Sequence, residues 1–363
     1  MLNERVMIEF DGNQSRVFIN ATQTYDAFID AYHRAAEYKG GICWKKVRNK
    51  EYLFRTSDRY GNGKTLGLRS PETEKIYKKF KAGKTEATDR FRTLREQLKE
   101  NARVCKARKI NRVPSITTKI LRELHQHDLL GEHVMVVGTN ALYAYEAAAG
   151  VFIDDRHLAT EDVDLLWDVN KRLTLPIRKK DRYRDFINIL KKVDKTFTIH
   201  RKERFRVSNA KGFMVDLLKA IPEKHDDDGI GIRMGSLDDV EAIGIVNLSW
   251  LLSEPKFEQT VIGADGVPAR IVAPDPRAYA LHKYWASQQL DRGRTKATRD
   301  RAQAVTVAKL TTEYLPHLDF EGSLLQKFPE EIVRSFKDSI ITEIEQSTPP
   351  TKDIKDDDLS MQI

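Results

Sequence analysis

Cysteine and long apolar runs are scarce in this sequence of 363 residues. The two cysteines, Cys43 and Cys105, lack the CxxC spacing of metal or redox sites, so we expect free thiols and no disulfide framework. No stretch approaches the roughly 20 consecutive apolar residues of a membrane helix. The first ten residues also lack the charged-then-apolar order of a signal peptide. We therefore expect a soluble, cytoplasmic protein that does not enter a membrane.

Positive charge is concentrated in the N-terminal third. Residues 1–115 carry 26 Lys and Arg against 14 Asp and Glu, a net charge of +12, whereas residues 116–363 carry 36 against 40, a net charge of −4. A basic module joined to a nearly neutral one indicates that the first module binds a polyanion. A solvated basic surface without such a ligand is the alternative that composition leaves open.

The basic segment, residues 1–115, predicts a helix-hairpin-helix module. Residues 20–38 place apolar side chains at helical spacing, and strand-like alternation follows on both sides of Gly61-Asn62-Gly63. The segment Gly61-Asn62-Gly63-Lys64 lacks the remaining residues of a phosphate loop and is interpreted as a turn. Sparse apolar residues at 71–107 indicate one or two exposed helices.

The remainder of the chain predicts an α+β domain followed by helices. Residues 116–273 alternate between short helices and apolar strands, which is typical of a mixed sheet with flanking helices. Residues 274–346 are predominantly helical, and the polar residues 347–363 predict a disordered tail. The expected strands have the sequences HVMVVG, DVDLLW, TFTIHR, RFRVSN and GFMVDLL, and TVIGADGVPARIVA is an expected hairpin.

Two carboxylates lie two residues apart in the apolar segment DVDLLW. Because side chains alternate along a strand, Asp162 and Asp164 fall on one face and the apolar residues on the other. Like charges this close repel each other, and hard divalent cations with oxygen ligands are the usual solution. We therefore predict a Mg²⁺ site here, with Mn²⁺ as the alternative ion. An exposed strand end without a metal is the competing interpretation.

Asp216 interrupts the apolar strand FMVDLL. A lone carboxylate buried there would cost several kcal/mol. A position beside Asp162 and Asp164, as a third metal ligand, removes that cost. An edge strand with Asp216 facing water is the alternative.

Gly138 and Thr139 stand where the strand HVMVVG ends and a helix begins. We expect free backbone amides and the Thr139 hydroxyl to face outward at this helix N-terminus, which is a geometry that binds phosphate. A simple turn is the alternative. Beside three carboxylates, this turn supplies the second half of a site for a metal-bound triphosphate.

The ordered set of Gly138-Thr139, Asp162-Val163-Asp164 and Asp216 resembles the signature of the DNA polymerase β superfamily of nucleotidyltransferases. Over residues 115–310 the sequence is similar to a bacterial group of nucleotidyltransferase-fold proteins. The resemblance departs from the commoner pattern, because Thr139 replaces a serine or glycine and the segment between Gly138 and Asp162 is long.

The resemblance implies roles for these residues. It implies that Asp162 and Asp164 hold two metal ions, that Asp216 helps to activate an acceptor hydroxyl, and that the Gly138 turn holds the triphosphate. It also points to Lys283, which matches a lysine that contacts nucleotide phosphates in related enzymes, with Asp300 placed to orient a cation. A solvated helical lysine and a structural His282 are the alternatives.

The predicted activity is metal-dependent transfer of a nucleotide from a nucleoside triphosphate to a hydroxyl group of RNA, tRNA or protein, with release of pyrophosphate. The expected catalytic and metal-binding residues are Asp162, Asp164 and Asp216. The expected nucleotide-binding residues are Gly138, Thr139 and Lys283. Residues 1–115 are expected to bind an RNA acceptor, because aromatic and cationic residues alternate there. The alternative is a non-catalytic nucleotide- or nucleic-acid-binding module on the same fold.

Overall fold

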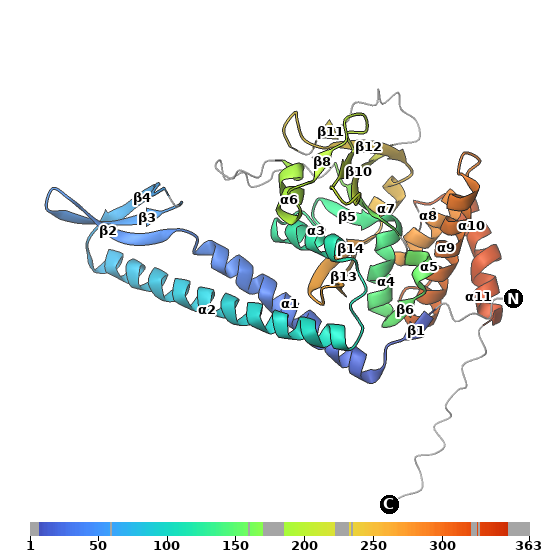
Figure 1. The fold of residues 1–363 in the computed structure, drawn as a ribbon, viewed down its shortest axis with the longest axis horizontal. Coiled ribbons are helices and arrows are strands. Elements are labelled where there is room, and N and C mark those ends of the chain that lie inside the picture. The colour runs from blue at the N-terminus through green and yellow to red at the C-terminus, as the bar shows by residue number, and fades with distance from the viewer. Residues whose placement is uncertain are drawn as a thin grey trace, which may run out of the picture.

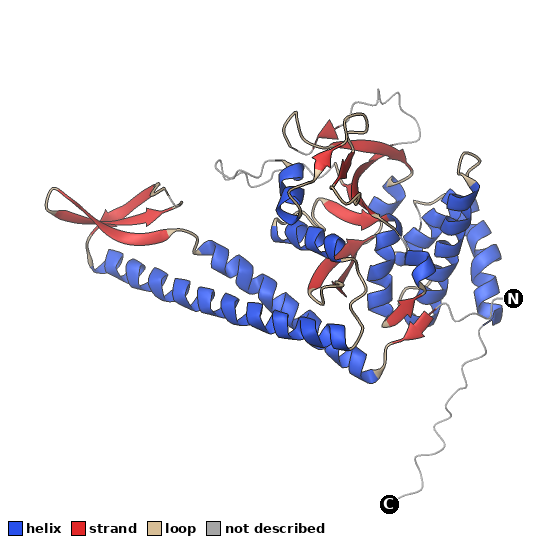
Figure 2. Ribbon diagram, in the orientation of Figure 1, coloured by secondary structure: helices blue, strands red, loops and turns tan. Residues whose placement is uncertain are grey.

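A long arm, a body built on a mixed sheet and a layer of C-terminal helices make up the protein (Figures 1 and 2). This computed structural model describes residues 7–58, 60–158, 160–169, 185–221, 232–233, 235–320, 325 and 327–347. Apart from Ser347, the tail expected at 347–363 lies outside the described residues. The α+β class expected from the sequence is confirmed.

The arm, residues 12–107, consists of two helices that lie side by side and a small sheet at their far end (Figure 1). The predicted antiparallel strands are confirmed, because β2 pairs with β3 and β3 with β4 in antiparallel register. The elements of the arm are α1 (Gly12–Glu37), β2 (Gly41–Val47), β3 (Lys50–Thr56), β4 (Gly63–Leu68) and α2 (Pro71–Ala107).

Helix α1 begins at Gly12, whereas the hydrophobic pattern predicted a start near residue 20. The cause is a capping box at Asp11. The Gln14 amide donates to Asp11 Oδ1 at 2.7 Å, and the Asp11 amide donates to Gln14 Oε1 at 2.9 Å. These bonds satisfy amides that have no partner inside the helix, so the helix begins before its apolar face does.

Helix α2 is one continuous helix of 37 residues, about 55 Å long at 1.5 Å per residue. Ser70 caps it and Pro71 occupies its first turn, where the missing amide of proline costs nothing. Apolar residues of α2 contribute to the seam with α1, where Leu98 packs with Tyr25 and Ile29. The rest of its surface is polar, which explains its low overall hydropathy.

The base of the arm is fixed to the body by polar contacts. Asp26 of α1 forms an ion pair with Arg270, and the Tyr25 hydroxyl lies 3.2 Å from His125 Nδ1. Burial raises the pKa of Tyr25 to about 12, so this hydroxyl stays protonated at neutral pH. The tip of the arm is therefore held at a set distance from the body rather than hanging on a loop.

Seven strands of the described residues form the sheet of the body, in the order β11-β12-β10-β7-β5, and β9 pairs with β10 on one side and with β8 on the other. Strands β7, β10 and β12 are parallel to one another, and β5 is antiparallel to β7. Parallel strands are buried on both faces, which accounts for their apolar sequences. The strands are β5 (Val134–Val137), β7 (Asp162–Trp167), β8 (Thr198–Ile199), β9 (Arg206–Ser208), β10 (Met214–Ile221), β11 (Ile232–Arg233) and β12 (Glu241–Val246).

Short helices flank this sheet, as expected for residues 116–273. Buried Asp239 accepts hydrogen bonds from the backbone amides of Phe186 and Ile187 and thereby caps α6 from a distant part of the chain. The helices of the body are α3 (Ser115–Gln126), the 3₁₀ turn η1 (Gly138–Ala141), α4 (Leu142–Ala149), α5 (Asp155–Leu158), α6 (Phe186–Val193) and α7 (Ser249–Ser253).

The expected hairpin and C-terminal helices are also present. Pro276 starts α8 as predicted, and Asp275 caps it. The elements are β13 (Phe257–Ile262), β14 (Pro268–Ala273), α8 (Pro276–Ser287), α9 (Arg294–Tyr314), α10 (Glu330–Phe336), the π-turn η3 (Lys337–Ile341) and α11 (Thr342–Ser347).

One large hydrophobic core joins the sheet to these C-terminal helices. Strand β1 (Met7–Glu9), which precedes the arm, pairs with β6 (Val151–Ile153) of the body. Among the described residues, the long helices are too polar to serve as membrane spans.

Candidate active site

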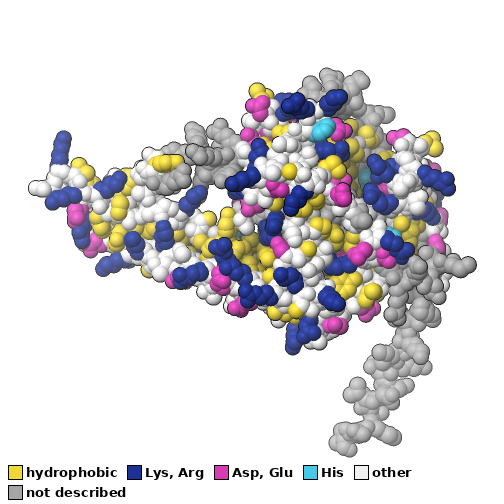
Figure 3. Space-filling view, viewed as in Figure 1, with side chains coloured by type: hydrophobic (Ala, Val, Ile, Leu, Met, Phe, Trp, Pro, Cys, Tyr) yellow, Lys and Arg dark blue, Asp and Glu magenta, His cyan; other side chains and the backbone are white. Residues whose placement is uncertain are grey.

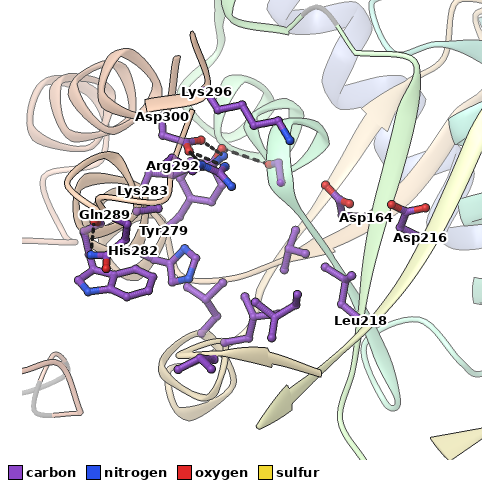
Figure 4. A pocket seen from close by; sticks show the side chains of 18 of the residues that line it. Asp164, Asp216, Leu218, Tyr279, His282, Lys283, Gln289, Arg292, Lys296 and Asp300 are labelled. Carbon is purple, nitrogen blue, oxygen red and sulfur yellow. Dashed lines mark hydrogen bonds and ion pairs between the residues drawn. The ribbon is translucent and has the colours of Figure 1, made fainter. Parts of the chain in front are cut away.

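The three predicted carboxylates lie on two neighbouring strands. Strands β7 and β10 are parallel, with Asp164 opposite Asp216 and Asp162 opposite Met214. Side chains at opposed positions share a face, and Figure 4 shows the carboxyl groups of Asp164 and Asp216 beside each other. Strand β10 is bonded on both edges and Asp216 is only 6% exposed. The alternative of an edge strand with Asp216 in water is therefore wrong.

The charge crowding predicted from the sequence is evident at Asp164. Burial, together with the negative charges of Asp162 and Asp216, raises the pKa of Asp164 from 3.8 to about 7. A carboxyl group shifted this far is only partly ionised at neutral pH. It gains by the approach of a cation, because a nearby positive charge favours its ionised form.

Arg206 of β9 compensates the charge of Asp216. Its Nε donates to Asp216 Oδ1 at 2.9 Å and its Nη2 donates to Asp216 Oδ2 at 2.7 Å, a bidentate pair. The Asp216 hydrogen bonds, followed by the Asp216 charge, raise the pKa of Arg206 far above its ordinary value. The buried carboxylate that the sequence left without a partner thus has an arginine on the adjacent antiparallel strand.

Asp162 is held at the start of β7. The Thr160 hydroxyl donates a hydrogen bond to Asp162 Oδ1, and Asn140 Nδ2 donates to the Asp162 carbonyl oxygen at 2.6 Å. Because Asn140 belongs to η1, this bond ties the carboxylate strand to the turn that follows Gly138. Asp162 is half-buried, so its carboxylate remains accessible from one side.

Gly138 lies against the carboxylate of Asp164. Its φ is +66°, a left-handed conformation that favours glycine, and a Cβ atom placed on it would lie 2.1 Å from Asp164 Oδ2. Any side chain at this position would therefore displace the carboxylate. The glycine allows the backbone of the turn to approach the charged edge of the sheet.

Thr139 differs from the expectation. It is 5% exposed, and its hydroxyl accepts a hydrogen bond from Gln303 Nε2 at 3.2 Å rather than facing outward. The chain forms a 3₁₀ turn at this point before α4 begins, so the hydroxyl turns toward α9. The role of Thr139 in nucleotide binding stays a prediction.

Lys283 of α8 and Asp300 of α9 form a buried ion pair. Lys283 Nζ donates to Asp300 Oδ1 at 2.7 Å, and Arg292 Nε donates to Asp300 Oδ2 at 2.8 Å. Burial lowers the pKa of Lys283, whereas the Asp300 charge opposes this shift. Burial acts to raise the pKa of Asp300, but Lys283 and Arg292 outweigh it and lower that pKa. The alternative of a solvated Lys283 is wrong, since its side chain is 11% exposed.

These groups face one cavity of about 610 Å³. Asp164, Asp216 and Gly138 line one side, and Lys283, Arg292 and exposed Lys296 line another (Figure 4). Between them lies an apolar wall from β12, α7 and α8, formed by Ile243, Ile245, Leu248, Leu251, His282 and Trp285. The cavity thus offers carboxylates, cations and apolar surface on separate walls.

His282 contributes to the apolar wall as a neutral side chain. Burial, followed by the charge of Lys283, lowers the pKa of His282 to about 3. Its buried Nε2 atom has no hydrogen-bond partner among the described residues. The ring lies against Trp285, with the ring centroids 5.6 Å apart.

The C-terminal helices hold the glycine turn in place. The Tyr279 hydroxyl of α8 donates to the Gly138 carbonyl oxygen at 3.1 Å. Gln303 of α9 donates both to the Thr139 hydroxyl and, at 3.0 Å, to the carbonyl oxygen of His157. The site is therefore assembled from the sheet and from helices more than 100 residues later in the chain.

No group of three His, Cys, Asp or Glu side chains within the described ranges converges as a ready metal cage. The contacts of the carboxylates explain this. Asp216 is drawn toward Arg206 and Asp162 toward Thr160, and Asp164 lies between them. The donor set nevertheless consists of carboxylate oxygens in a crowded, negatively charged place, which suits a hard divalent cation.

A comparison with known protein families identifies the family to which this chain belongs. A family model described as Nucleotidyltransferase matches residues 115–328, which is more than half of the chain and includes every residue of the site. The chain belongs to this family. Nucleotidyl transfer and a nucleoside triphosphate substrate follow from the membership. No curated protein and no solved structure shows a significant match to this nucleotidyltransferase.

Sequence reasoning missed Arg206, Arg292 as a partner of Asp300, and the clamp formed by Gln303. The segment RFRVSN was predicted as a strand at hairpin-like distance from the Asp216 strand. Pairing the two in antiparallel register would have placed Arg206 opposite Asp216. No comparable signal existed for Gln303, whose contact to Thr139 spans 164 residues.

The first prediction concerns pH and stability without divalent cations. Since the folded-state pKa of Asp164 is raised to about 7, its neutral form stabilises the nucleotidyltransferase below pH 4, and this stability is lost as pH rises through 7. In EDTA, Asp164→Asn should melt at the same temperature as the wild type at pH 4 and several degrees higher at pH 8. Thermal melting of both proteins across pH 4–8 measures this difference.

Asp89→Asn, on the exposed surface of α2, controls for the loss of one charge and should show no such pH dependence. Equal melting of the Asp164→Asn and wild-type proteins at pH 8 would show that Asp164 is not crowded.

The second prediction concerns the Arg206–Asp216 pair. Arg206→Ala leaves a buried carboxylate without its cation, and we expect a loss of about 3 kcal/mol in the free energy of unfolding. Mg²⁺ should restore part of this loss in Arg206→Ala, because the ion replaces the missing positive charge. Urea unfolding with Mg²⁺ or with EDTA measures both effects. The control is Arg204→Ala, on the turn that leads into β9, whose free energy of unfolding should be the same with Mg²⁺ as with EDTA.

Proposed function

We propose that this protein uses Mg²⁺, or Mn²⁺ in its place, to transfer a nucleotide from a nucleoside triphosphate to a hydroxyl group, in the manner of the DNA polymerase β superfamily. The observation that carries the proposal is the in-register placement of Asp164 and Asp216, with Asp162 two residues away, on the wall of a cavity that also holds Gly138 and Lys283. This is a carboxylate site facing a phosphate site across a space of nucleotide size.

The carboxylates fit a divalent cation. Their crowding raises the pKa of Asp164, first through burial and then through Asp162 and Asp216, and a cation would relieve this crowding. Asp162 and Asp164 are the residues we assign to hold the ion, with Asp216 beside them. When bound, the ion supplies charge stabilisation for the phosphate oxygens and orientation of the triphosphate.

The residues opposite the carboxylates suit a triphosphate. The turn at Gly138 and Thr139 presents backbone next to the Asp164 carboxylate, and Lys283 with Arg292 adds positive charge on the far wall. Asp300 holds both cations at fixed positions. The apolar wall that includes Trp285 then accommodates the base and the sugar, as apolar walls do in nucleotide pockets.

In the proposed reaction, the oxygen of an acceptor hydroxyl forms a bond to the α-phosphorus. The bond between the α-phosphorus and its bridging oxygen breaks, and pyrophosphate leaves with that oxygen. Asp216 accepts the proton of the hydroxyl. The bidentate bonds from Arg206 fix the direction of the Asp216 carboxylate.

The third prediction tests the carboxylates. Asp162→Asn, Asp164→Asn and Asp216→Asn should each reduce pyrophosphate release from Mg²⁺ and a nucleoside triphosphate at least 100-fold, because Asp162 and Asp164 hold the ion that stabilises the transition state and Asp216 accepts the proton of the hydroxyl. Each variant should keep its circular dichroism spectrum, and in EDTA none should melt more than a few degrees below the wild type. The assay uses each of the four labelled triphosphates, with total RNA or protein extract as acceptor.

Asp168→Asn, one residue beyond β7, is the matched control and should remain active. Wild-type protein that binds a triphosphate but releases no pyrophosphate with any acceptor would support a non-catalytic nucleotide-binding module instead.

The fourth prediction tests Lys283. Lys283→Ala should raise the KM for the triphosphate about tenfold or more, the value of a hydrogen bond to a charged group. Because Asp300 orients this lysine, Asp300→Asn should raise the KM in the same direction. The KM of the double variant should be no higher than the higher KM of the two single variants, since both changes remove the same interaction. Steady-state kinetics of the four proteins in this cycle provides the measurement.

Lys309→Ala, on α9 and paired with Glu313, should leave the KM unchanged. Additive effects of the two substitutions would show that Asp300 and Lys283 act separately.

A further inference from the structure

The sheet at the far end of the arm has two different faces. On the inner face, which packs on α2, Ile42 and Leu53 are buried and the Trp44 ring lies 5.8 Å from that of Tyr77. Gly67 also points to α2, since a Cβ atom there would lie 3.2 Å from Thr73. The inner face is therefore a small hydrophobic core, and Trp44 belongs to it.

The outer face points away from α2. Strand alternation and cross-strand register place six of its side chains together, because Lys45 opposes Tyr52, Phe54 opposes Thr65 and Tyr52 opposes Leu68. Val47 and Leu68 are 54% and 46% exposed. We define the outer face by these six residues, which are Lys45, Val47, Tyr52, Phe54, Thr65 and Leu68. Within the described residues, no helix covers them (Figure 1).

Positive charge surrounds this face. Residues 39–84, which comprise the sheet and the adjoining part of α2, carry 14 Lys and Arg against 4 Asp and Glu, a net charge of +10. Residues 1–38 and 85–115 together carry 12 against 10. The excess charge of the N-terminal segment thus belongs to the far half of the arm, where Figure 3 shows Lys and Arg side chains at the tip.

The turn between β2 and β3 adds a cation in an unfavourable conformation. Arg48 and Asn49 both have positive φ, at 45° and 62°. Such hairpin turns favour Asn, Asp or Gly at both positions, so an arginine at the first carries a conformational cost. Its side chain is exposed at the rim of the outer face.

We propose that the outer face binds single-stranded RNA and thereby holds the acceptor of the nucleotidyl transfer. The bases stack on Tyr52 and Phe54, and Lys45, Arg48 and their neighbours bind the phosphates. The exposed hydroxyl of Thr65, opposite Phe54, lies where a ribose 2′-hydroxyl can pair with it. This inference rests on the proposed function for the choice of an acceptor, but the binding itself does not require catalysis.

Lys45 links the two kinds of contact. Its Nζ lies 3.4 Å from the centroid of the Phe54 ring, a cation–π contact that covers the ring in the free protein. A base that stacks on Phe54 displaces this ammonium, which then lies beside the phosphates of the same strand. RNA binding thus replaces the contact between Lys45 and the Phe54 ring by two contacts with the nucleic acid, which are base stacking on Phe54 and the contact of Lys45 with the phosphates.

The position of the outer face constrains the length of the acceptor. Helix α2 alone is about 55 Å long, and the sheet stands well clear of the body (Figure 1). A short oligonucleotide therefore binds the outer face without reaching the carboxylates, which separates binding from transfer.

The test, which is the fifth prediction, measures fluorescence anisotropy of a labelled 12-nucleotide single-stranded RNA of mixed sequence with the full-length protein. Tyr52→Ala should weaken the Kd about tenfold through loss of stacking, whereas Tyr52→Phe should stay within about twofold of the wild type. Phe54→Leu, which keeps an apolar side chain in the sheet, should behave like Tyr52→Ala. Circular dichroism identifies any variant that does not fold.

A charge-matched comparison addresses the phosphates. Lys45→Ala/Arg48→Ala/Lys50→Ala should weaken binding and reduce the slope of log Kd against log salt by about 2, because three phosphate contacts are lost. Arg95→Ala/Arg103→Ala/Lys106→Ala removes three exposed cations from the near half of α2 and should have a small effect. Equal effects of the two triple variants would overturn the assignment to the outer face.

Three further measurements test the choice of RNA and separate this inference from the proposed function. Asp164→Asn should bind the RNA as the wild type does, so failure of catalysis leaves the binding result intact. Equally tight binding of the same sequence as single-stranded DNA would overturn the choice of RNA. No binding at 50 mM salt, with pyrophosphate release on a protein acceptor, would make the arm a protein-docking element while the nucleotidyl transfer stands.

Discussion

The site depends on one constraint, which is that three carboxylates lie close together on two neighbouring strands of a buried sheet. Parallel pairing of β7 and β10 places Asp164 opposite Asp216, where neither is fully hydrated. Arg206 compensates one charge, and burial with the remaining repulsion keeps the pKa of Asp164 near neutrality, at about 7. Without a cation, the negative charge of the three carboxylates is therefore only partly neutralised. A cation that bound here would favour the ionised form of Asp164 and would thereby stabilise the folded sheet.

The remaining half of the site comes from the helices at the other end of the chain. Tyr279 and Gln303 bond to the turn at Gly138 and Thr139, and the Lys283–Asp300 pair lies in the same two helices. Helices α8 and α9 therefore hold both the buried Lys283–Asp300 pair and the glycine turn in place. A buried Lys283 is costly to keep charged, which explains why Asp300 is fully buried beside it.

The sequence predicts those features of the site that depend on local periodicity. The two-residue repeat of a strand is enough to place Asp162 and Asp164 on one face, and the apolar residues around Asp216 are enough to indicate burial. It does not predict the pairing register that brings Arg206 to Asp216, because register is set by contacts between strands. It also failed for the Thr139 hydroxyl and for the start of α1, where a 3₁₀ turn and an Asp11 capping box overrode the hydrophobic pattern.

The separation of charge between arm and body has a physical rationale. The site carries clustered carboxylates, and residues 116–363 have a net charge of −4, so a polyanion near the site is repelled. At physiological ionic strength such repulsion extends only about 8 Å. A basic sheet at the end of a 37-residue helix lies many times farther away, beyond the reach of the carboxylates. The proposed attraction of a polyanion at the tip and the proposed binding of a metal-bound triphosphate in the body would therefore not oppose each other, which a basic patch beside the carboxylates would not allow.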